Sequence, residues 1–219
     1  MNRIRQLINR WKTDSSFKTM VTAFGSLMAT VIFAIYNGFL GIYHSSIWHG
    51  TICVYYIFLV LLRGLIIAAE KKDALHRKQG FTAKNVYMMA SIYLLVLNIS
   101  LVVPFSLMVR QQKPVYMTMV PAITMAAYTT YKVTMASIHF RKKEKTPGSF
   151  VRLLQTINFI DALVSIITLQ NTLIMVNSKG EDTGLLPLTA LSSGAVWIAI
   201  LVLSVIAVRR GFKDSSFEQ

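Results

Sequence analysis

Six long apolar stretches constrain what this chain can fold into. A helix needs about 20 mainly apolar residues to cross the hydrocarbon layer of a membrane. We expect membrane spans at Thr19–Tyr43, Ile47–Ala69, Val86–Val109, Val115–Phe140, Phe150–Val176 and Leu185–Val208. The connections between them are too short for a soluble core. The sequence therefore predicts an all-α bundle of six transmembrane helices over residues 19–208, followed by a cytoplasmic tail at 209–219.

The composition excludes several other classes of protein. Hydrophobic residues make up 54% of the chain and charged residues only 15%, against about 25% in ordinary globular domains. A net charge of +14 would indicate a nucleic-acid binder in a soluble protein, but the apolar excess favours a membrane protein whose basic residues face one side of the bilayer. A disulfide framework is excluded because Cys53 is the single cysteine.

The basic residues also predict the orientation, because Lys and Arg near span ends are retained in the cytoplasm. Most of the 23 basic residues fall before the first span, in the second and fourth connections, at the start of the fifth span, and in the tail. The opposite side carries only Arg110, Lys113 and Lys179. We therefore expect a multi-pass protein of the cytoplasmic membrane with both termini in the cytoplasm.

Residues 1–18 form a distinct basic segment ahead of the first span. Ile4, Leu7, Ile8 and Trp11 recur at helical spacing among basic residues, which is typical of a short amphipathic helix lying on a membrane surface. The alternative is a positively charged tail that only fixes the topology.

Three ionisable residues lie deep inside the predicted spans: Arg63, Lys132 and Asp161. Such residues are costly in a membrane and are candidates for function by default. Each is eight or nine residues from a basic residue at the inner end of its span, or roughly 12–14 Å along the helix. Three helices could thus present two cations and one carboxylate in one layer. Polar side chains within about two turns could complete the site: Tyr56, Tyr128, Tyr131 and Asn158.

These three charges admit two interpretations. If all are ionised the group carries a net +1, which favours a small anionic solute or an anionic lipid headgroup as ligand, with Asp161 as the protonatable or cation-coupling group. In the other interpretation, Asp161 pairs with Arg63 or Lys132 only to lock helices together.

Two prolines lie at similar depth in the outer halves of the third and fourth spans. Pro104 and Pro121 would each break a backbone hydrogen bond and kink a helix, and paired kinks could shape an outward cavity as in transporters. The alternative is that these prolines have no functional consequence, since membrane helices tolerate them.

We find no pattern that predicts a metal, a cofactor or an enzyme. His44 and His49 are five residues apart, off a shared helical face, and no carboxylate accompanies them. No Gly-x-Ser-Gly element with a later histidine is present, and a lipid-acting enzyme at the His44–His49 turn is a weaker alternative. The leading hypothesis is a small transporter or channel-like permease; the main alternative is a non-transporting accessory, sensing or lipid-interacting membrane protein. A homodimer is compatible with so small a bundle.

Several short strings give the chain a family resemblance. They are Tyr36-Asn37-x-Phe39-Leu40-Gly41, Ser46-Ile47-Trp48-x-Gly50, Tyr55-Tyr56, Arg63-Gly64, Ala127-Tyr128-Thr129, Tyr131-Lys132 and Asp161-Ala162-Leu163-Val164-Ser165. With them the chain resembles a group of uncharacterised bacterial six-span membrane proteins. The resemblance implies a bacterial cytoplasmic membrane and transfers no catalytic or binding residue.

Overall fold

The computed structural model of this chain describes residues 15–75, 80–103, 106, 119–141, 149–177 and 186–216. Within them the regular structure is helical. The helices are α2 (Ser15–Tyr43), α3 (Ile47–Leu75), α4 (Gly80–Ser100), α6 (Met119–Arg141), α7 (Ser149–Asn177) and α8 (Leu186–Ser216). The predicted amphipathic helix before the first span falls almost entirely outside the described residues, as does Pro104.

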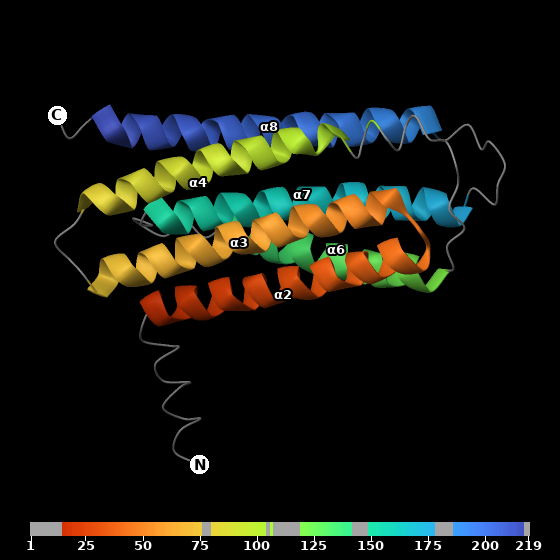
Figure 1. Ribbon diagram of the computed structural model, residues 1–219, viewed down its shortest axis with the longest axis horizontal. Helices are drawn as coiled ribbons and strands as arrows, with labels where there is room; N and C mark the ends of the chain where they lie inside the picture. Colours follow the sequence, from red (N-terminus) through yellow and green to blue (C-terminus); the bar gives the residue numbers. More distant parts are fainter. Residues whose placement is uncertain are drawn as a thin grey trace, which may run out of the picture.

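The six helices lie lengthwise beside one another, and the start of α2 and the end of α8 lie at the same end of the bundle (Figure 1). Four helices are long and apolar enough to cross a membrane, over Phe24–Tyr43, Ile47–Ala69, Val151–Ile174 and Leu191–Phe212. In α4 the apolar part, Asn85–Ser100, is shorter. The described part of α6 does not meet the same standard of length and apolarity. The prediction of an all-helical fold is therefore confirmed for the described residues, and four of the helices could span a membrane.

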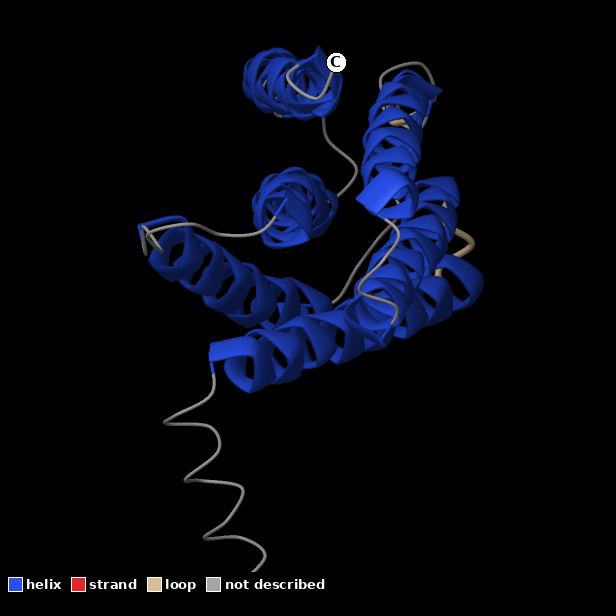
Figure 2. Cartoon of the chain, turned by 90° about the vertical axis from the view of Figure 1, so that its left-hand side faces the viewer, coloured by secondary structure: helices blue, strands red, loops and turns tan. Residues whose placement is uncertain are grey.

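The helices pack mainly as pairs, α2 against α3, α6 against α7 and α4 against α8. Only α7 contacts all five of the other described helices. Figure 2 shows the bundle from its end, where the helices are spread apart rather than closed into a tight ring. A side chain in the middle of α7 therefore lies where the three helix pairs meet.

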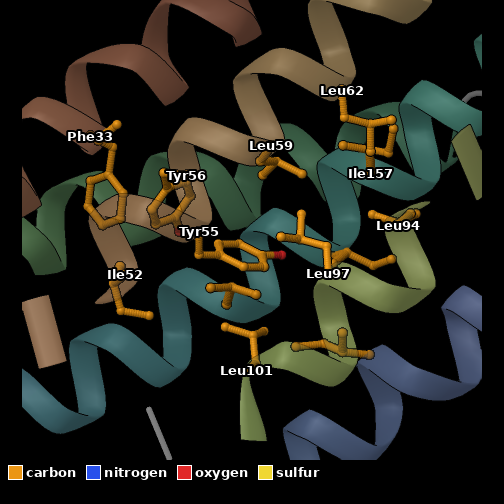
Figure 3. Close-up of a cluster of buried hydrophobic side chains, with 14 of the residues drawn as sticks. Phe33, Ile52, Tyr55, Tyr56, Leu59, Leu62, Leu94, Leu97, Leu101 and Ile157 are labelled. Atoms are coloured by element: carbon orange, nitrogen blue, oxygen red, sulfur yellow. The ribbon is translucent and has the colours of Figure 1, made fainter. Parts of the chain in front are cut away.

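The core is aromatic and aliphatic, and Figure 3 shows part of it. Side chains from α2, α3, α4 and α7 meet there, among them Phe33, Tyr56, Leu59, Leu94 and Ile157, all at most 2% exposed. Large apolar side chains also cover the outside of the bundle, such as Ile35 on α2 and Leu65 on α3. Such an exterior fits contact with lipid rather than water.

The turn between α2 and α3 brings the two helices unusually close. Ser45 adopts a left-handed backbone conformation with φ of 49°, which reverses the chain in a few residues. At the crossing, a Cβ atom on Gly41 would lie 2.8 Å from the backbone nitrogen of Gly50. A side chain larger than hydrogen would therefore force these helices apart.

We expect Gly41→Ala to lower the free energy of unfolding in detergent by about 1–3 kcal/mol, the usual cost of overpacking. Gly194→Ala on α8 is the matched control, because a Cβ there meets nothing within 4 Å. The free energy of unfolding of Gly194→Ala should equal or exceed that of wild type, since replacing a helical glycine by alanine gains about 0.5–1 kcal/mol. Thermal unfolding of both variants checks this; equal stability would contradict the close crossing.

Candidate charged centre

The three deep charges are in contact. Arg63 on α3 donates from Nη2 to Asp161 Oδ2 at 2.8 Å, and Lys132 on α6 donates from Nζ to the other carboxylate oxygen, Oδ1. All three side chains are buried. Asp161 therefore uses each of its oxygens for a different cation, and each cation comes from a different helix.

The first helix encloses the guanidinium of Arg63. Arg63 Nη1 donates to Ser26 Oγ at 2.7 Å, to the Ser26 carbonyl at 3.1 Å and to Thr30 Oγ1 at 2.7 Å, all on α2. The Thr30 hydroxyl also lies 3.3 Å from Asp161 Oδ2. Helix α2 thus supplies neutral oxygens that help to solvate the buried ion pair, as such a pair requires.

The ammonium of Lys132 lies among three aromatic rings. Its Nζ is 5.2 Å from the ring centroid of Phe33, 4.9 Å from that of Tyr56 and 4.8 Å from that of Tyr128. Phe33 stacks on Tyr128 with centroids 4.2 Å apart and meets Tyr56 edge-on at 4.8 Å. Aromatic rings within about 6 Å of a cation attract it through the negative charge of their faces. We call Phe33, Tyr56, Tyr128 and Asp161 the ammonium cage.

The other polar residues predicted for this layer have different surroundings. Tyr128 donates from its hydroxyl to the Ala29 carbonyl at 2.8 Å, and Asn158 Oδ1 accepts a hydrogen bond from Ser26 Oγ at 2.8 Å. Tyr131 is 55% exposed and contributes no ring to the cage. It neighbours Lys132 in sequence, so its side chain points about 100° away around the helix.

A cavity of about 190 Å³ lies between α2, α6 and α7. Lys132 and Asp161 form part of its wall, together with Ser26, Ala29 and Asn158. Tyr131 and Met135 also line it. This volume is far above the roughly 10–15 Å³ that one water molecule requires. The charged centre therefore adjoins a space large enough for water or a small organic ion.

Around the charged centre, polar side-chain contacts join the α2–α3 pair to the α6–α7 pair. The α2–α3 and α6–α7 pairs each pack extensively within themselves, whereas backbone contact between the two pairs is sparse. Side-chain bonds cross between them, including Arg63 to Asp161, Ser26 to Asn158 and Tyr128 to Ala29. The charged centre is thus the main polar connection described between these pairs.

Sequence reasoning missed the contribution of α2, namely Ser26, Thr30 and Phe33. These side chains carry no charge, whereas the sequence analysis looks for ionisable residues and polar residues near them. A usable signal existed. Ser26, Thr30 and Asn37 are four and seven residues apart, which places polar atoms along one face of an otherwise apolar helix.

The histidine turn forms a different arrangement. His49 is buried, and its Nδ1 lies 3.0 Å from Asn37 Oδ1. His44 instead contacts the ring of Tyr43 edge-on. Among the residues that the structure describes, no group of three or more His, Cys, Asp or Glu side chains could hold a metal ion.

Pro121 is the third residue of α6 and is buried. Pro121 does not line the cavity described above. An outer cavity shaped by Pro104 and Pro121 stays a prediction.

Comparison with known protein families, curated proteins and solved structures finds no match to this chain. The roles of the residues in the charged centre therefore rest on their own geometry and chemistry.

We expect Asp161→Asn to lower the free energy of unfolding by about 3–5 kcal/mol, because it leaves two buried cations without their carboxylate. Thr172→Val is a matched control on the same helix: Thr172 is also buried, and its hydroxyl bonds only to the Thr168 carbonyl of its own helix among the described contacts. It should change stability by less than about 1 kcal/mol. Denaturation in detergent would measure both, and equal effects would contradict a central role for Asp161.

Proposed function

We propose that this chain is a small transporter or channel-like permease whose substrate site is the charged centre. The observation that carries the proposal is the cavity of about 190 Å³ that has both Lys132 and Asp161 in its wall. Ionisable side chains at membrane depth commonly face a water-filled cavity and mark the path of a solute. Here Lys132 and Asp161 border the space and aromatic rings surround the Lys132 ammonium, a combination that suits solute binding.

The proposal includes six membrane crossings with both termini in the cytoplasm of a bacterial cell. Helices α4 and α6 lie lengthwise along the four candidate spans, which supports their crossing as well (Figure 1). Basic residues of the described helices collect at the end of the bundle where α2 starts and α8 ends, as cytoplasmic retention requires. Near the ends of these helices they are Lys18, Lys71, Lys72, Lys84, Arg141, Arg152, Arg209, Arg210 and Lys213.

The alternative is a non-transporting accessory, sensing or lipid-interacting protein. It is favoured by one observation, the set of polar bonds that tie the α2–α3 pair to the α6–α7 pair. In that case the charges only hold helices together. Adding both Arg63→Gln and Lys132→Met to Asp161→Asn removes all three charges and would then restore most of the stability, and the interface around the cavity would exclude water.

Cysteine accessibility tests the permease proposal, in a protein whose native Cys53 is replaced by Ala. Ala29→Cys places a thiol in the cavity wall, whereas Met28→Cys places one at the same depth on an outward face, where Met28 is 46% exposed. Only a hydrated thiol ionises and reacts. We therefore expect a charged, membrane-impermeant thiol reagent to modify Ala29→Cys at least about tenfold faster in membranes.

The two cysteine variants also show which outcome contradicts the proposal. If both react equally slowly from either side of the membrane, the cavity contains no accessible water and the permease proposal fails. The alternative would then stand.

A further inference from the structure

We propose that the ammonium cage is a binding site for a small organic ammonium ion, and that the side chain of Lys132 is its occupant in this conformation. The inference rests on the proposed permease function and names its substrate class as organic monocations. Lys132 would act as a tethered competitor that leaves the cage when the solute binds.

The geometry of the cage suits a cation. Three ring centroids lie 4.8–5.2 Å from one nitrogen, and the rings come from three different helices. A carboxylate oxygen of Asp161 contacts the same nitrogen. Aromatic rings combined with a negative group are the recurring means by which proteins recognise ammonium and quaternary ammonium ligands.

The charged centre holds one more positive charge than the ion pair needs. Arg63 already supplies a counter-ion to Asp161 at 2.8 Å, and Ser26 and Thr30 satisfy the guanidinium further. The ammonium of Lys132 is therefore a surplus positive charge, and the rings compensate for it. The cage thus provides a cation position in addition to the ion pair.

The side chain of Lys132 has free space beside it. It forms part of the cavity wall, and its only hydrogen bond among the described contacts is to Asp161. The lysine stem of four carbons is flexible. Swinging the stem into the cavity would vacate the cage, and a solute ammonium taking its place would leave the charge held inside the cage unchanged.

The same geometry disfavours the anionic ligand that the charge count alone suggested. Ring faces carry negative potential and repel an anion. The carboxylate of Asp161 also forms part of the cavity wall beside Lys132. An anion placed next to the Lys132 ammonium would be repelled by the aromatic rings and by the Asp161 carboxylate.

Chemical rescue of Lys132→Ala tests the proposal. This variant removes the native occupant and opens a space of its size. Propylammonium chloride should raise the thermal unfolding midpoint of purified Lys132→Ala in a saturable way, relative to sodium chloride at the same ionic strength. Lys132→Met is the matched control, because its side chain fills the space of the lysine stem without a charge, and it should show no such rise.

Removing the carboxylate gives a second control. In the double variant Lys132→Ala, Asp161→Asn the effect of propylammonium should disappear. Equal shifts in Lys132→Ala and Lys132→Met would overturn the proposal, since the cation would then act elsewhere. A shift with acetate and none with propylammonium would also overturn it and indicate an anion site.

Wild-type protein provides a measurement that does not depend on the folding of Lys132→Ala. Tetramethylammonium should bind wild type in lipid nanodiscs, and Phe33→Leu should weaken that binding at least about tenfold by removing one ring of the cage. Unchanged binding in Phe33→Leu, or no binding to wild type at concentrations up to tens of millimolar, would contradict the cage.

Uptake by proteoliposomes separates this inference from the permease proposal. Radiolabelled tetramethylammonium is suitable because its permanent charge prevents passage as a neutral amine. Rescue and binding without uptake would leave the ammonium site in place and remove the transport function. Uptake without rescue or cage-dependent binding would leave transport in place and remove this site.

Discussion

The structure depends on one buried carboxylate shared by two cations. Asp161 lies on α7, the helix that contacts all of the other described helices, and it pairs with Arg63 from α3 and Lys132 from α6. An isolated charge at this depth would cost several kcal/mol. That cost is offset only if the α2–α3 and α6–α7 pairs meet with Arg63, Lys132 and Asp161 in register. The carboxylate therefore fixes how the two pairs fit together.

The two cations have different surroundings, and this difference carries the functional argument. Arg63 is held by a carboxylate oxygen and the oxygens of Ser26 and Thr30, as expected for a guanidinium with a fixed set of donors. The Lys132 ammonium contacts one carboxylate oxygen and lies near three aromatic rings, and Lys132 borders a cavity. An ion pair with several further hydrogen bonds thus lies beside an ammonium that a solute could replace. The first suits a structural role and the second suits binding.

Part of this arrangement could be predicted from the sequence because helix geometry converts residue number into depth. Counting from basic residues placed Arg63, Lys132 and Asp161 in one layer, and their side chains are in contact. The neighbours in space were harder to predict. Phe33 has no polar atom, and nothing in one sequence indicates that its ring faces Lys132. Tyr131 adjoins Lys132 in the chain and lines the same cavity, yet its ring is not part of the cage, because rotation along a helix separates neighbours. The described part of α6 falls short of a typical span, partly because it carries the charge of the site, Lys132.

The most direct measurement of the central claim is the dipolar coupling between Lys132 Nζ and the Asp161 carboxyl carbon, recorded by solid-state nuclear magnetic resonance in lipid bilayers. The lysine resonance is assigned as the one missing from Lys132→Met. We predict a strong coupling, typical of a hydrogen-bonded pair, that weakens when propylammonium is added in excess. Absence of a coupling in the ligand-free protein would contradict the shared carboxylate, and a coupling unaffected by propylammonium would contradict exchange at the ammonium cage.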